Sequence, residues 1–160
     1  MRSLSIVGKS PGFEKYLETE GAHVWCVSSV FKQMVPDKVD FIFNLHKPEL
    51  FESWLPEEYK RVVTAHKGVD VNYRYFPAND LLNKYGNAFG SSIVWMIAIA
   101  IEQGYREINI FGCDMATHEE YMDQRDTFFY MIGRAEALGI IVNIPETSRA
   151  FFKDRVYGVV

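Results

Sequence analysis

The chain has few cysteines, no long hydrophobic run and no strong excess of either charge. Of its 160 residues, 2 are cysteines, Cys26 and Cys113, and their spacing does not match a metal-binding CxxC pair. We therefore expect a reduced intracellular protein and predict no metal site. No apolar run reaches the roughly 18 residues of a membrane-spanning helix, and the N-terminus lacks a signal-peptide core. These absences predict a soluble, cytoplasmic protein.

The charge balance argues against a nucleic-acid surface. The formal net charge is −4 and the pI is about 5.6, whereas a protein that neutralises many phosphates is typically basic. A hydrophobic content of 48% suits one core, so we expect a single domain over residues 1–160. The predicted partner is a small molecule, with neither nucleic acid nor membrane. Apolar surface around Trp25, Trp54 and Trp95 leaves a homo-oligomer open.

Short apolar runs alternate with helical patterns along most of the chain. We predict strands at 4–7, 23–27, 39–43, 61–64, 107–111 and 140–144, and helices at 13–20, 49–58, 90–103 and 123–138. Residues 67–87, rich in Gly, Asn, Asp, Tyr and Pro, are interpreted as a long irregular loop over the sheet edge. The alternation predicts an α/β fold, a three-layer Rossmann-like domain with a mostly parallel central sheet.

Polar and glycine residues follow the predicted strands. Because open α/β sheets bind ligands beyond the carboxyl ends of their strands, these residues are expected to meet in one cleft. Ser91 and Ser92, behind Gly90, open a helix whose N-terminus would suit a phosphate or carboxylate. A nucleotide or nucleotide-sugar fits such a cleft, and no other cofactor is predicted. The predicted nucleotide-binding residues are Gly8, Lys9, Ser10, Ser28, Asn44, Gly90, Ser91, Ser92 and Gly112.

Several of these residues also have a purely structural interpretation. The segment from Gly8 to Gly12, GKSPG, lacks a full phosphate-loop motif and is more typical of an ordinary strand-to-helix turn, with Ser10 as the cap and Pro11 in the first helical turn. Asn44 could end a strand in a turn, and Ser91 with Ser92 could only cap a helix. From the sequence alone, a ligand-binding role and a purely structural role both remain open for these residues.

The polar segment after the strand at 107–111 holds the predicted catalytic groups. Asp114 is the leading carboxylate for a general base, although an acid at a strand end also often caps a turn. His118 and Tyr121 are further catalytic candidates. Gln124 is suited to read a base or sugar edge, and Arg125 to hold a phosphate or carboxylate through two hydrogen bonds.

The segment SSIVWMIAIAIEQGYREINIFGCDM, residues 91–115, resembles the pattern S-S/T-G-V-x-x-x-x-A-I-x-x-G-Y-K-E-I-x-L-x-G-x-D. Small bacterial sialyltransferase-like enzymes share this pattern with the related 6-hydroxymethylpterin diphosphokinase-like (DUF115) proteins. Weaker similarities cover most of the chain, and its compact form looks like that of small phage-encoded members. The resemblance implies a Rossmann-like sheet that binds a cytidine nucleotide or a nucleoside triphosphate.

The chain differs from the family at positions that, by the resemblance, would bind the nucleotide. Lys9 stands where the family has an asparagine, Ser28 near a second asparagine, and Ile93 in place of a glycine. The leading functional prediction is a nucleotide-dependent transferase, glycosyltransferase-like, that uses a nucleotide-sugar or related donor. The alternatives are a non-catalytic nucleotide-binding or sequestering module and a small nucleotide hydrolase.

Overall fold

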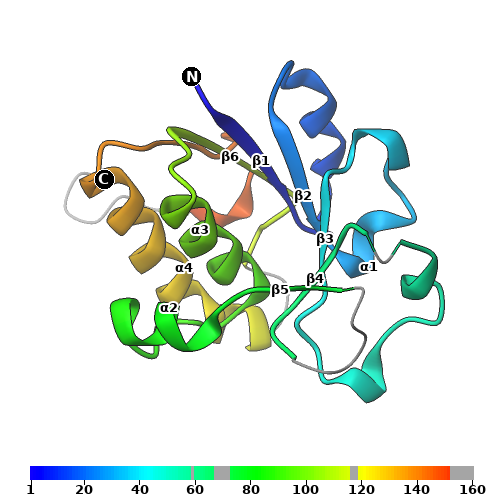
Figure 1. Ribbon diagram of the computed structural model, residues 1–160. Helices are drawn as coiled ribbons and strands as arrows, with labels where there is room; N and C mark the ends of the chain where they lie inside the picture. The colour runs from blue at the N-terminus through cyan, green and yellow to red at the C-terminus, as the bar shows by residue number, and fades with distance from the viewer. Residues whose placement is uncertain (59, 67–72, 116–118, 152–160) are drawn as a thin grey trace.

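A single parallel sheet forms the centre of the molecule (Figure 1). The computed structural model describes residues 1–58, 60–66, 73–115 and 119–151, with the backbone alone for 56, 57, 119–123 and 151. Every strand pairing in these residues is parallel. The seven strands are β1 Ser3–Val7, β2 His23–Val27, β3 Phe41–Phe43, β4 Val62–Thr64, β5 Arg74–Tyr75, β6 Glu107–Phe111 and β7 Ile141–Asn143. The predicted α/β, Rossmann-like architecture is confirmed.

The strand order creates a reversal at the middle of the sheet. The order is β5-β4-β3-β2-β1-β6-β7, so the chain builds outward from β1 to β5 and then returns to the other side of β1. In the register of the sheet, Leu4 of β1 lies opposite His23 of β2, and Ser3 of β1 lies opposite Glu107 of β6. In doubly wound sheets the loops beyond such a reversal diverge and leave a crevice. The reversal here lies between β1 and β6.

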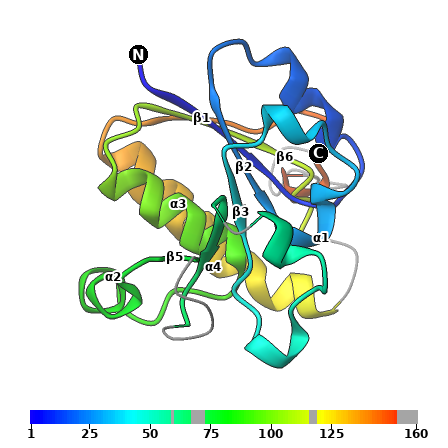
Figure 2. The same ribbon diagram turned by 45° about the vertical axis from the view of Figure 1, so that its right-hand side comes forward.

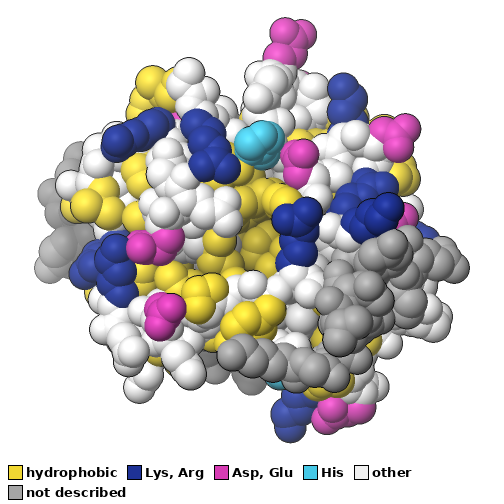
Figure 3. Space-filling view, in the orientation of Figure 1, with side chains coloured by type: hydrophobic (Ala, Val, Ile, Leu, Met, Phe, Trp, Pro, Cys, Tyr) yellow, Lys and Arg dark blue, Asp and Glu magenta, His cyan; other side chains and the backbone are white. Residues whose placement is uncertain are grey.

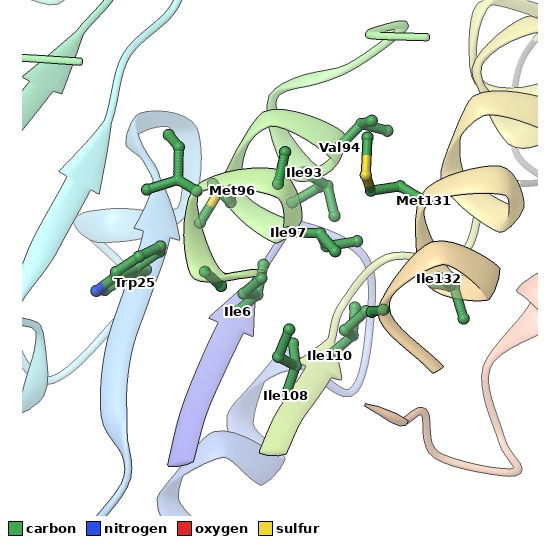
Figure 4. Packing of buried hydrophobic residues seen from close by; sticks show 14 of the residues in the cluster. Ile6, Trp25, Ile93, Val94, Met96, Ile97, Ile108, Ile110, Met131 and Ile132 are labelled. Carbon is green, nitrogen blue, oxygen red and sulfur yellow. The ribbon is translucent and has the colours of Figure 1, made fainter. Parts of the chain in front are cut away.

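Apolar residues alternate in direction along the strands and bury both faces of the sheet. Leu4 and Ile6 face one core, while Val7 faces the other. Figure 4 shows Ile6, Ile108 and Ile110 directed toward α3. A continuous apolar pattern is expected for parallel strands covered on both sides.

Two helices that lie side by side cover the first face (Figures 1 and 2). They are α3, Ser92–Glu102, and α4, Glu119–Ala137, and the shorter α2, Ala78–Tyr85, packs beside them. The opposite face is covered by α1, Ser28–Phe31, and by the 3-10 helix η1, Phe13–Glu18. The remaining 3-10 helices are η2 Pro36–Lys38, η3 Pro48–Leu50, η4 Leu55–Glu58 and η5 Arg149–Phe151.

Three sequence predictions about these elements were wrong. The helix expected at 49–58 is replaced by η3 and η4, because a proline at 56 cannot donate an interior helical hydrogen bond. The helix expected at 13–20 is the 3-10 helix η1, which follows Gly12 at φ 85° and has no side-chain cap, so Ser10 does not cap it. Of the irregular loop expected at 67–87, residues 67–72 lie outside the described part of the structure, and residues 73–87 contain β5 and α2 instead.

Helix α2 was not predicted, although its sequence contains a helical pattern. Leu81 and Tyr85 are one turn apart and both are buried, with Pro77 before the helix and Gly86, at φ 71°, after it. Polar residues between them masked this spacing.

Beside α3 the sheet face is partly open. Figure 3 shows hydrophobic side chains gathered near the centre of this view, with Lys and Arg side chains around them. Phe41 on β3 is half-buried, and the Arg74 guanidinium carbon lies 4.6 Å from its ring centre. Trp25, predicted as surface, is only 1% exposed and belongs to the core. No helix among the described residues is long and apolar enough to cross a membrane.

Candidate functional site

A cleft of about 520 Å³ lies at the carboxyl ends of β1 and β6, where the strand order reverses. Its volume falls in the range of about 300 to 1,000 Å³ that is usual for small-molecule sites. The lining combines loops after β1, β2, β3 and β6 with the first turn of α3. The lining residues are Gly8, Lys9, Ser10, Val27, Ser29, Leu45, His46, Phe89, Gly90, Ser91, Ser92, Ile93, Trp95, Gly112, Cys113, Asp114, Met115 and Gln124.

The floor of the cleft is formed by two loops that touch through glycines. The Gly8 N–H donates to Phe111 O and the Ser10 N–H donates to Gly112 O, both at 2.9 Å. A Cβ on Gly8 would lie 2.4 Å from Gly112 O, and a Cβ on Gly112 would lie 2.6 Å from Gly8 O. Because these two N–H groups are already bonded, the loop after β1 cannot offer them to a phosphate.

The N-terminus of α3 opens onto the cleft beside these loops. Ser91 is the N-cap, with φ −153° and ψ 163°, and its hydroxyl accepts a hydrogen bond from the Val94 N–H at 3.4 Å. Ser91 and Ser92 both line the cleft. The first turn of a helix has N–H groups without intrahelical partners and the positive end of the dipole. This end of the cleft therefore suits an anion.

Gly90 allows the start of α3 to approach α4 closely. A Cβ at Gly90 would lie 2.6 Å from Thr127 Oγ1 and 3.4 Å from Gln124 Cα. This contact brings Gln124, which the sequence analysis selected as a substrate contact, into the lining of the cleft. Arg125 is not in the lining, and its guanidinium donates to the Ala150 carbonyl instead.

Asp114 follows β6 and is 7% exposed at the edge of the cleft. Its Oδ1 accepts hydrogen bonds from Arg149 N–H at 3.3 Å and from Ser148 Oγ at 3.5 Å. The carboxylate thus holds the start of η5 against the end of β6. Asp114 therefore caps a turn, as one sequence interpretation expected, and it also lies in the lining of the cleft.

Ser28 and Asn44 lie behind the lining. Ser28 is 4% exposed and Asn44 is 1% exposed, and both donate hydrogen bonds to the Glu52 carboxylate. Their neighbours Ser29 and His46 are exposed and line the cleft. The strand ends reach the cleft as predicted, but the residues that face it differ from the two selected. Of the remaining predicted groups, His118 and the side chain of Tyr121 fall outside the described part of the structure.

An aromatic pair in the lining was missed by sequence reasoning. Phe89 and Trp95 stack with ring centres 3.8 Å apart and an interplanar angle of 17°, and Phe76 packs against Trp95 at 5.4 Å. Phe89 directly precedes Gly90, and Trp95 lies one helical turn beyond Ser92. These positions, next to the predicted phosphate-binding residues at the start of the helix, were the sequence signal that could have identified both rings as cleft residues.

The thiol in the lining is not an activated nucleophile. Burial raises the pKa of Cys113 to about 12, and the negative charge of Asp114 adds to this effect. The thiol donates to Phe111 O at 3.3 Å. Within the described ranges, no group of three or more His, Cys, Asp or Glu residues could hold a metal ion.

Comparison with known proteins found matches among solved structures. No family model matches the chain, and no curated protein matches it significantly. The chain is similar to the sialyltransferase CstII from Campylobacter jejuni in complex with cytidine-5'-monophosphate, with 16% identity, 90% of this chain and 79% of that chain covered, and a TM-score of 0.42. For CstII in complex with CMP-3FNeuAc, the identity is 16%, the match covers 90% of this chain and 81% of that chain, and the TM-score is 0.43. At this identity the likeness concerns the fold alone.

Proposed function

We propose that this protein is a nucleotide-dependent, glycosyltransferase-like enzyme that holds a nucleotide-sugar or a related activated donor in the cleft between β1 and β6. The observation that carries the proposal is the position of the cleft. It lies across the strand-order reversal, between two glycine loops, and at the N-terminus of an 11-residue helix. This combination is the usual place for nucleotide phosphates in doubly wound folds.

The donor phosphate is expected to bind at the start of α3. The hydroxyl of Ser92 and the free N–H groups of the first turn would donate to it, and Ser91 would keep that turn fixed. Lys9, exposed on the loop after β1, adds a positive charge to the same cleft. These groups would stabilise the negative charge that grows on the phosphate as the sugar departs.

Asp114 is the proposed general base. In the transfer step an acceptor hydroxyl loses its proton to the carboxylate, and its oxygen bonds to the anomeric carbon. The bond from that carbon to the phosphate oxygen breaks, and its electron pair leaves with the nucleotide. The hydrogen bonds from Arg149 and Ser148 to Oδ1 would fix the carboxylate while its other oxygen accepts the proton.

The other predicted residues take supporting roles in this proposal. Gln124, in the lining, would contact the sugar or base. His118 and Tyr121, close in sequence to Asp114, remain candidates for assisting the leaving phosphate. Arg125 would contact substrate only after releasing Ala150, and Ser28 or Asn44 only after releasing Glu52. The resemblance of residues 91–115 to sialyltransferase-like enzymes favours a cytidine nucleotide.

A module that binds a nucleotide without turnover is the second candidate. The observation in its favour is that Asp114 already has a structural task at the start of η5. Such a module would return a nucleotide-sugar intact, whereas a transferase or hydrolase would release the free nucleotide.

Ligand binding and turnover can be tested separately. Thermal unfolding would be followed with CMP, CDP, CTP, ATP, GTP, UDP-sugars and CMP-sialic acid, because a ligand specific for the folded state raises the midpoint. We expect the largest rise with cytidine nucleotides. Chromatography of nucleotide-sugars that have been incubated with the protein and a panel of sugar acceptors then detects free nucleotide. A midpoint unchanged by every compound would contradict the proposal, and binding without release would favour the module.

A further inference from the structure

One carboxylate ties together the ends of two neighbouring strands beside the cleft. Glu52 Oε1 accepts a hydrogen bond from Ser28 Oγ at 3.0 Å, and Oε2 accepts one from Asn44 Nδ2 at 2.8 Å. Ser28 directly follows β2, and Asn44 directly follows β3. Glu52 itself lies in the connection between η3 and η4, so it reaches back to the sheet edge.

These bonds determine the orientation of the Asn44 amide. Since Nδ2 must donate to Glu52, Oδ1 points the other way and accepts the His46 N–H at 3.3 Å. Asn44 is only 1% exposed. A reversed amide would place Oδ1 against the Glu52 carboxylate and Nδ2 against the His46 N–H, and neither mismatched pair could bond to water instead. As a hydrogen-bond acceptor, Glu52 therefore fixes the orientation in which Asn44 holds the backbone at His46.

The network ends at the cleft. Ser29 follows Ser28 and His46 lies two residues after Asn44, and both line the cleft although neither Ser28 nor Asn44 does. We propose that Glu52 is a positioning residue, which acts through Asn44 to place the His46 imidazole against the bound nucleotide. This inference rests on the proposed nucleotide site and adds His46 to its ligand contacts.

The coupling between Glu52 and His46 distinguishes positioning from a general effect on folding. We expect Glu52→Ala and His46→Ala each to weaken binding of the preferred cytidine nucleotide about three- to tenfold, the value of one ordinary hydrogen bond. The double variant should bind no more weakly than either single variant, because Glu52 acts through His46. Isothermal titration calorimetry would measure all four affinities.

A conservative variant and a matched control sharpen the test. Glu52→Gln can accept from Asn44 Nδ2 through its amide oxygen and donate to the Ser28 hydroxyl through its amide nitrogen, so it should retain an affinity near that of wild type. Glu49→Ala removes an exposed carboxylate from the neighbouring η3 and should leave the affinity unchanged. Additive losses in the double variant would overturn the inference even if wild-type protein binds nucleotide well.

Amide hydrogen exchange provides a readout that needs no ligand. In the unliganded protein, the His46 N–H should exchange faster in Glu52→Ala than in wild type or Glu49→Ala, because Asn44 no longer holds it. An unchanged exchange rate at His46 would refute positioning. If wild-type protein binds no nucleotide in calorimetry, the proposed function fails, whereas the exchange experiment still decides whether Glu52 positions His46.

Discussion

At the scale of single residues, Gly8 and Gly112 show how a sequence signal can have two causes. Both were predicted to approach a nucleotide, and both do line the cleft. Their missing side chains first serve contact between the loops after β1 and β6, where a Cβ on either would lie within 2.6 Å of a carbonyl oxygen. The glycines thus form the cleft before any ligand enters it.

Gly112→Ala should strongly destabilise the fold. The residue has φ 63°, and its new Cβ would lie 2.6 Å from Gly8 O, 2.8 Å from Phe13 Cβ and 2.9 Å from Ser10 O. Left-handed strain and overpacking together predict a loss of about 3 kcal/mol or more in the free energy of unfolding. The control Gly21→Ala, at φ 72° with open space, should lose only about 1–2 kcal/mol. Urea unfolding would compare the two, and equal losses would contradict the packing role.

Asp114→Asn separates the chemical and structural roles of this side chain. The asparagine oxygen can still accept the Arg149 N–H, so the fold and nucleotide affinity should be retained. Removal of the proposed general base should lower kcat by about 100-fold or more. Release of nucleotide from the donor, measured with thermal unfolding as the control for folding, checks this. An unchanged kcat would exclude Asp114 as the base.

At the scale of elements, α3 combines packing with ligand binding along one helix. Its body is buried between the sheet and α4, as Figure 4 shows for Ile93, Val94 and Ile97. Its first turn opens onto the cleft at Ser91 and Ser92. The sequence predicted this helix well because the serine cap, the apolar body and Gly104, at φ 75°, are all local features.

Two substitutions at Ser91 should separate helix capping from anion binding. Ser91→Ala removes the N-cap acceptor and should lower stability by about 1 kcal/mol. Ser91→Asp retains a good cap, so stability should stay near wild type, but its charge would repel a phosphate. We expect nucleotide affinity to fall at least tenfold in Ser91→Asp. Unfolding curves and calorimetry test this, and full affinity in that variant would place the phosphate elsewhere.

At the scale of the whole molecule, the order of the strands brings the site together. The loop after β1 and the loop after β6 are separated by about a hundred residues in sequence, yet the reversal places them in contact. The same packing buries both cysteines, which are free thiols. Burial raises the pKa of Cys113 to about 12, and it also raises the pKa of Cys26 above its ordinary value.

The buried thiols predict that stability falls at alkaline pH. Between the pKa of about 8.5 of an unfolded cysteine and the raised folded values, the unfolded chain binds fewer protons, so stability decreases as pH rises. Below about pH 8.5 this contribution is fully present. From pH 7.5 to 9.5 we expect a loss of about 1.4 kcal/mol for each thiol. Urea unfolding at both pH values measures it, and Cys113→Ser should show about half the loss. A loss unchanged by that substitution would contradict the assignment.

Local sequence was sufficient for the strongest elements and for the fold class. The boundaries of β2 and β6 are those predicted, and β1 differs by one residue, because their apolar runs are bounded by polar or glycine residues. Prediction failed at α2 and at 49–58, where short segments depend on tertiary contacts. The long helix predicted from 123 begins at Glu119, since its first turn has no apolar periodicity of its own.

The sequence by itself determined that polar strand ends and a serine-capped helix would meet in one cleft, since parallel strands present their carboxyl ends at one edge. Only the tertiary structure decided which residues face that cleft. Residues one or two positions apart after a strand end point in different directions, so Ser29 and His46 line the cleft while Ser28 and Asn44 bond to Glu52. That choice depends on a carboxylate whose position is fixed by folding, and no local pattern encodes it.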